Sequence, residues 1–190
     1  MQTNLLWTGR EYHSLENCLV TKTDSGFVIA STIVGYYEGR IYKVEYQIKT
    51  NLRWETLLVE INSRHSDQAQ NIRMEGDGKG KWMREGKEVA QYTGCIDIDI
   101  PLTPFTNTLP INRLRLEENQ TAEIKVLYLD LLSQQIIPVK QKYVRLPGAK
   151  YHYENIPNDF EADIAVDESG FVADYPSLFV RTASLKSNYP

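Results

Sequence analysis

Two aspartates, Asp97 and Asp99, are the residues of this 190-residue chain whose spacing points most directly to chemistry. They alternate with Ile96, Ile98 and Ile100, so a strand would place both carboxylates on one face with Cβ atoms about 7 Å apart. Paired carboxylates can act as acid and base or can hold a hard cation. A hydrogen-bonded, structural pair is the simpler interpretation, because no third acidic ligand follows at short spacing.

A segment rich in prolines and hydroxyl groups, Thr103–Arg113, follows these aspartates. Prolines within and before it fix φ and remove backbone donors. They are Pro101, Pro104 and Pro110. Three of its polar side chains can bond to local backbone or to a ligand. They are Thr106, Asn107 and Thr108. The pattern predicts a rigid loop, a common place for a binding site on a β scaffold, and the best helix candidate, Asn107–Leu116, overlaps its second half.

Other arrangements that carry catalysis or metal binding are missing from the sequence pattern. The three histidines show neither HxH nor HxxxH spacing, and no GxSxG turn is present. They are His13, His65 and His152. Cys18 and Cys95 lie far apart and are predicted to be free thiols, with Cys95 buried and inert on a strand. We therefore expect no catalytic residue, no metal and no cofactor, and the pattern leans away from an enzyme.

Composition and charge narrow the classes of partner. The formal net charge is −4 and the pI is about 5.5. No block of basic residues appears, which argues against nucleic-acid binding. The N-terminus lacks a positively charged region followed by an apolar run, and no apolar segment has the length of a membrane span. These observations predict a cytoplasmic protein without a transmembrane segment.

The elements around the two aspartates are predicted to be strands. Residues Arg40–Lys49 alternate between apolar and charged side chains, and Phe27–Val34 is rich in β-branched residues. Further strands are expected at Leu52–Ile61, Gln70–Glu75, Lys81–Arg84, Glu123–Leu132, Ile136–Leu146, Tyr151–Tyr153, Phe160–Val166, Phe171–Asp174 and Leu178–Arg181. Pro138 suggests that the strand Ile136–Leu146 lies at a sheet edge or contains a bulge at this residue. The pattern predicts one all-β domain over residues 1–190, with little helix.

More than ten antiparallel strands in one sheet must curl or close, which predicts a barrel-like roll with an interior for side chains or for a ligand. Tyrosine is abundant, with 12 in the chain. Aromatic rings in a roll can stack on sugars or line an acyl-chain cavity, although plain filling of the sheet is the simpler interpretation.

The motif that surrounds the aspartates carries a resemblance to a known family. Residues Gly94–Asp99, followed by Thr103–Leu114, resemble the signature of the bacterial putative glycolipid-binding family, first described as a domain of unknown function. Supporting matches run along the chain. They lie at Trp54, Gly78–Trp82, Tyr143, Tyr151–Glu154 and Asp174–Phe179. The resemblance covers nearly the whole chain and implies a rolled β-fold similar to carriers that shelter lipid anchors inside a curved sheet.

The resemblance implies a non-enzymatic protein that holds a glycolipid or another amphiphile. In this hypothesis Arg113 binds the head group, and Thr106, Asn107 and Thr108 bond to sugar hydroxyls. Asp97 and Asp99 complete the polar part of the site. Three aromatic residues line the apolar part. They are Trp54, Trp82 and Tyr128.

Two alternatives stay open. The first is an enzyme for a small substrate, with Asp97 or Asp99 as its base, which a carboxylate of raised pKa in an apolar cavity would support. The second is an interaction module without a ligand, which pairs through an exposed sheet edge with a partner or with itself as a homodimer.

Overall fold

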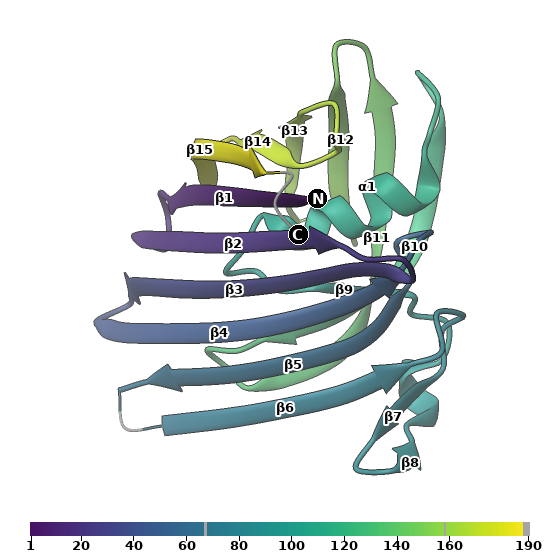
Figure 1. Cartoon of the computed structure of the whole chain (residues 1–190). Coiled ribbons are helices and arrows are strands. Elements are labelled where there is room, and N and C mark those ends of the chain that lie inside the picture. Colours follow the sequence, from purple (N-terminus) through teal and green to yellow (C-terminus); the bar gives the residue numbers. More distant parts are fainter. Residues whose placement is uncertain (67, 158, 188–190) are drawn as a thin grey trace.

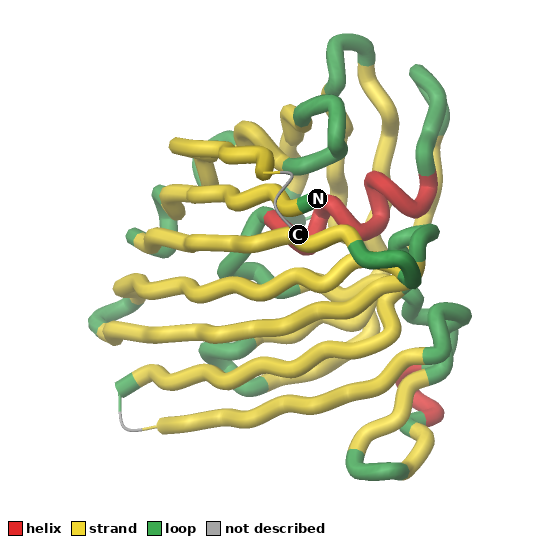
Figure 2. The backbone as a smooth tube through the Cα atoms, in the orientation of Figure 1, coloured by secondary structure: helices red, strands yellow, loops and turns green. Residues whose placement is uncertain are grey.

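The computed structural model describes residues 1–66, 68–157 and 159–187. Strands make up most of this part of the chain, and helix is confined to short segments (Figure 2). The strands of the first half are β1 Gln2–Gly9, β2 Ser14–Lys22, β3 Gly26–Tyr37, β4 Arg40–Asn51, β5 Thr56–His65, β6 Gln68–Gly76, β7 Trp82–Arg84 and β8 Lys87–Glu88. The later strands are β9 Asp97–Asp99, β10 Thr121–Asp130, β11 Gln135–Leu146, β12 Lys150–Ile156, β13 Glu161–Val166, β14 Val172–Tyr175 and β15 Phe179–Ser187.

All of these strands belong to one sheet of 15 strands, in the order β8-β7-β6-β5-β4-β3-β2-β1-β15-β14-β13-β12-β11-β10-β9. Neighbouring strands are antiparallel except for β9 and β10, which are parallel. Pairing of β1 with β15 joins the first strand of the chain to the last described one. The prediction of an all-β, mainly antiparallel sheet is confirmed.

Hairpins built on alternating sequences form the broad face that β1–β6 present in Figure 1. In β4, Tyr42, Val44, Tyr46 and Ile48 are buried, while the residues between them point outward. Alternation with period two places one set of side chains against the core and the other toward water. The same rule holds for β2 and β6, so the sheet has one apolar inner face along this half.

The sheet curls without closing. Its outermost strands, β8 and β9, pair with only one neighbour each within the described residues. Strands β9–β11 pass behind the face of β1–β6, and the helix α1, Thr108–Leu114, lies between the two parts of the curl (Figure 1). The curled roll therefore agrees with the architecture that the sequence predicts. None of the described helices is long and apolar enough to cross a membrane.

Two local predictions need correction or refinement. The predicted strand Leu52–Ile61 begins only at Thr56, because Trp54 has a φ of 64° and its N–H bonds back to the carbonyl of Asn51 in a turn. Pro138 lies inside β11, but pairing of β11 with β12 begins only at Lys140. At Pro138 the strand is thus locally an edge, where a missing N–H is tolerated.

The segment Pro101–Leu114, which we call the interior segment, lies inside the curl. It contains a 3-10 helix, Phe105–Asn107, followed by α1, so the predicted helix in this region is confirmed. Ten consecutive residues, Leu102–Ile111, are buried. The interior segment is therefore part of the core, and not a loop on the surface.

Candidate functional site

Asp97 forms the main ion pair inside the curl. Its side chain is fully buried on β9 and accepts from the Arg113 guanidinium, with Nε–Oδ1 at 3.0 Å and Nη2–Oδ2 at 2.6 Å. Burial raises the pKa of the Asp97 carboxyl, and the guanidinium opposes that rise. Both oxygens face the same guanidinium, a two-point contact that fixes the end of α1 against β9.

Asp99 has a different environment although it lies on the same strand. Thr106 donates to Oδ1 over 3.1 Å, and the amide of Gln141 donates to Oδ2 over 2.7 Å. Both donors are neutral, and burial raises the pKa of the Asp99 carboxyl. A carboxylate has about four acceptor positions, of which these two bonds occupy two. Asp99 thus keeps hydrogen-bonding capacity.

A cavity of about 450 Å³ lies beside Asp99. Its polar floor consists of Asp99, Thr103, Asn107 and Gln141. These residues come from β9, the interior segment and β11, so the curl itself brings them together. The volume falls in the range of about 300–1,000 Å³ that is usual for small-molecule sites.

Aromatic rings form much of the wall of this cavity. They are Tyr12, Tyr128, Tyr153, Phe160, Tyr175 and Phe179. The parallel register of β9 and β10 sets Tyr128 beside Asp99. Within the described residues, the hydroxyls of Tyr12, Tyr128 and Tyr175 form no hydrogen bond to the protein. Tyrosine hydroxyls in mostly apolar surroundings normally find a partner, so these three are available to a ligand.

Two further hollows differ in character. A cavity of about 440 Å³ shares Tyr12, Pro101 and Tyr128 with the first one, so the two cavities adjoin. A larger hollow of about 1050 Å³ lies over the outward face of β2–β6 and the β7–β8 turn. Its lining is dominated by exposed polar side chains such as Asn62 and Arg73. The cavity at Asp99 is the better site, because it has a buried polar floor and apolar walls.

The structure brings only part of the predicted site together. Asp99, Asn107 and Tyr128 line the cavity. Thr106 supports Asp99 from behind, since its hydroxyl also accepts from the Ile100 N–H over 3.2 Å. Asp99, Thr106 and Asn107 belong to one hydrogen-bond network through Gln141 and Tyr143.

The other predicted residues lie elsewhere in the core. Asp97 and Arg113 bond to each other, and Thr108 is fully buried. Trp54 stacks on Phe27, with ring centroids 4.0 Å apart. The indole of Trp82 donates to the Cys95 carbonyl over 2.7 Å. None of these five predicted residues is among those that line the three hollows described above.

Sequence reasoning did not select several residues of this cavity. Gln141 is the most important, because it holds Asp99 and also lines the floor. Its neighbour Tyr143 donates to Asn107 Oδ1 over 2.9 Å. The sequence carries a weak signal for Gln141. Residues two apart on a strand share a face, so Gln141 shares a face of β11 with Tyr143, and both are 2% exposed. Tyr12 lies in a turn, where no periodicity marks it.

A second buried carboxylate, Glu16, adjoins the cavity floor. Ser31 and Tyr46 each donate to Glu16 Oε1 over 2.7 Å, and the Tyr46 hydroxyl lies 3.3 Å from that of Thr103. Glu16 Oε2 has no partner within the described residues. Burial raises the pKa of Glu16 to about 7. Sequence reasoning did not select Glu16, although period two along β2 places it on the same face as Cys18 and Val20.

Both cysteines are free, as predicted, and both are buried. The sequence pattern predicts that Cys95 lies on a strand, but it lies just before β9, which begins at Asp97. Burial raises the pKa of the Cys95 thiol to about 11, so it stays protonated at neutral pH. A protonated thiol is a poor nucleophile, which agrees with an inert structural cysteine.

The fold and the cavity define a rolled β-sheet protein with an enclosed segment and a site of small-molecule size. The chain belongs to the family described as putative glycolipid-binding, whose sequence model matches residues 4–181. This membership supports a binding role at the level of the family.

One solved structure is similar over most of the chain. It is the crystal structure of a DUF1089 family protein from Pseudomonas aeruginosa, 33% identical in sequence, with a TM-score of 0.81. The match covers 88% of this chain and 91% of that one. No curated protein sequence matches the chain.

The Asp97–Arg113 pair predicts a large effect on stability. Arg113→Ala leaves a buried carboxylate without its cation, and we expect the free energy of unfolding to fall by about 3–5 kcal/mol in urea titrations. The control Lys43→Ala removes an ion pair in which both side chains are half exposed, and should cost less than about 1 kcal/mol. Equal, small losses for both variants would contradict a structural role for this pair.

The raised pKa of Glu16 predicts that the free energy of unfolding depends on pH. Its pKa is higher in the folded chain than in the unfolded one, so its favourable contribution is complete below about pH 4.5 and is lost as the pH rises through about 7. The full loss is about 3 kcal/mol. Glu16→Gln should therefore lose less stability than the unmodified chain between pH 5 and pH 8 in urea titrations.

The matched control is Glu45→Gln, because Glu45 is half exposed on the outward face of β4. It should keep the pH dependence of the unmodified chain. If Glu16→Gln keeps that dependence as well, Glu16 does not titrate in this range.

Proposed function

We propose that this protein binds an amphiphile with a sugar head group, such as a glycolipid, in the cavity beside Asp99. The observation that carries the proposal is a cavity of about 450 Å³ with a carboxylate on its floor and, on its wall, three tyrosine hydroxyls that form no hydrogen bond within the described residues. Family membership supports the same ligand class.

The polar floor suits a ligand that carries several hydroxyl groups. Asp99 has acceptor positions left after its bonds to Thr106 and Gln141. A tyrosine hydroxyl can both donate and accept, so Tyr12, Tyr128 and Tyr175 suit sugar hydroxyls, which do the same. Their rings offer apolar faces to the C–H face of a sugar. A simple hydrocarbon would leave these polar groups unpaired, which is costly.

An acyl chain finds apolar surface along the same cavity. Ile137, Val139, Ile156 and Leu178 belong to its lining, and Ile137 is 44% exposed. Apolar residues that reach the surface mark a path from the polar floor to the outside. In this proposal the sugar lies against Asp99 and the chain extends past Ile137, where burial of its methylene groups contributes about 0.8 kcal/mol each.

The proposed site differs from the one that the sequence suggests. It keeps Asp99, Asn107 and Tyr128, and it adds Gln141 with the tyrosines of the wall. Arg113 instead holds the interior segment in place through Asp97. The tryptophans Trp54 and Trp82 serve as packing residues of the core.

Asp99 also favours a second candidate function, an enzyme acting on the same class of ligand. Burial raises its pKa, and it lines a cavity, as a general base would. Asp97 does not suit that role, because both of its oxygens face Arg113. Turnover of a sugar-bearing probe that Asp99→Asn abolishes without loss of binding would favour the enzyme.

The binding proposal can be tested with octyl glucoside below its critical micelle concentration, titrated calorimetrically into the full chain. Asp99→Asn should weaken binding at least tenfold, because a hydrogen bond to a charged group contributes about 1.5–3 kcal/mol. Tyr128→Phe, which removes one hydroxyl, should weaken it by a smaller factor, about threefold to tenfold.

The control Asn62→Ala alters the larger hollow on the outward face of β5 and should leave the affinity unchanged. Loss of binding in Asn62→Ala, with normal binding in Asp99→Asn and Tyr128→Phe, would place the ligand in that hollow and contradict the proposal. Thermal unfolding of each variant checks that it is folded.

A further inference from the structure

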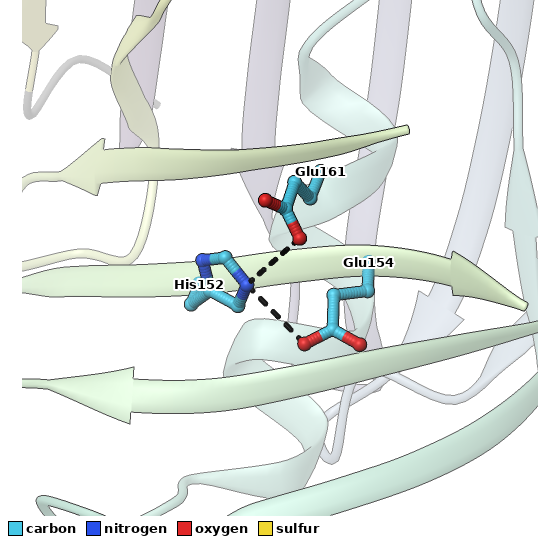
Figure 3. A group of neighbouring side chains, drawn as sticks. All are labelled: His152, Glu154 and Glu161. Carbon is cyan, nitrogen blue, oxygen red and sulfur yellow. Dashed lines mark ion pairs between the residues drawn. The ribbon is translucent and has the colours of Figure 1, made fainter. Parts of the chain in front are cut away.

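We propose a second site, for a zinc ion, on the outward face of β12 and β13. Its ligands are His152 Nε2, one oxygen of Glu154 and one oxygen of Glu161, and Figure 3 shows both glutamate side chains next to the imidazole. These residues do not line the cavity at Asp99. The sequence pattern gives no sign of the site, because Glu161 comes from the next strand and no metal-binding spacing marks His152.

The strand register brings the ligands together. His152 pairs with Asp163, and Glu154 pairs with Glu161, in the antiparallel ladder of β12 and β13. Residues two apart on a strand share a face, so all four side chains lie on one side of the sheet. Like charges directly opposite each other, as in Glu154 and Glu161, destabilise a sheet unless a cation lies between them.

The distances suit a small cation with nitrogen and oxygen ligands. Nε2 of His152 lies 3.2 Å from Glu154 Oε1 and 3.8 Å from Glu161 Oε2. All three ligand atoms lie within 4.8 Å of one another. Zinc bonds of about 2.0–2.2 Å in a tetrahedral site separate neighbouring ligand atoms by about 3.4 Å. Small side-chain adjustments therefore complete the geometry.

Asp163 orients the imidazole for metal binding. Its Oδ1 lies 2.7 Å from Nδ1 of His152. With the Nδ1 proton donated to this carboxylate, the lone pair of Nε2 points toward Glu154 and Glu161. A carboxylate that holds the second nitrogen of a metal-binding histidine is the usual arrangement around zinc, and it strengthens the ligand.

The local charge balance leaves room for a divalent ion. The carboxylates of Glu154, Glu161 and Asp163 surround His152, and the ammonium of Lys142 lies 2.9 Å from Glu154 Oε1. A divalent ion can bind several carboxylates at once. An imidazole nitrogen in the set favours zinc over magnesium or calcium, which prefer oxygen ligands alone.

The test is a calorimetric titration of the metal-stripped full chain with zinc chloride at pH 7.5. We expect one zinc per chain. His152→Ala should weaken binding at least tenfold, and Asp163→Asn should weaken it about tenfold to a hundredfold through the orientation of the imidazole. Lys142→Met should bind zinc equally well or more tightly, because a competing cation is removed.

His13→Asn is the matched control, because His13 is exposed and its φ of 41° is one that asparagine tolerates. It should bind zinc like the unmodified chain. Two results would overturn the proposal: no stoichiometric zinc binding, or equal affinities in His152→Ala and His13→Asn. If His152→Ala fails to fold, Glu161→Gln, on an exposed side chain, provides the same test.

Discussion

The buried ion pair between Asp97 and Arg113 is the contact on which the arrangement of the site depends. It joins the short strand β9 to the end of α1 and so holds the interior segment inside the curl. To stay ionised, a carboxyl group as deeply buried as Asp97 needs a close cation, since an unpaired charge in the core would cost several kcal/mol. This requirement fixes where the interior segment can lie.

Placement of the interior segment in turn determines where space remains. The middle of the curl is filled by side chains such as Phe105 and Leu109, so the cavity lies to one side, between the interior segment, β10–β12 and β14. A polar chain runs from Asp99 through Gln141 to Tyr143 and Asn107 on its floor. Thr103 links that floor to Tyr46 and Glu16 on the far side. A connected set of polar side chains therefore lies where the core meets the cavity.

The strands could be predicted because alternation is local: β4 needs only its own residues to define a buried face. The site could be predicted only in part, because its contacts join residues distant in sequence. Asp97 and Asp99 each lie between two isoleucines in the sequence, yet Asp97 bonds to Arg113, whereas Asp99 bonds to Gln141 and faces a cavity. That difference arises from the way the sheet curls, and the alternation of residues along one strand does not encode the curl. The His152 cluster depends likewise on the β12–β13 register.

Native mass spectrometry of the full chain, incubated with a monoglucosyl diacylglycerol, tests whether the Asp99 cavity holds a sugar-bearing amphiphile. We expect a one-to-one adduct that survives gentle activation and is released on denaturation. It should form less readily with the matching diacylglycerol that lacks the sugar. Detection of only the lipid-free chain under all gentle conditions, or equal binding of the two lipids, would contradict the proposed binding of a sugar-bearing amphiphile.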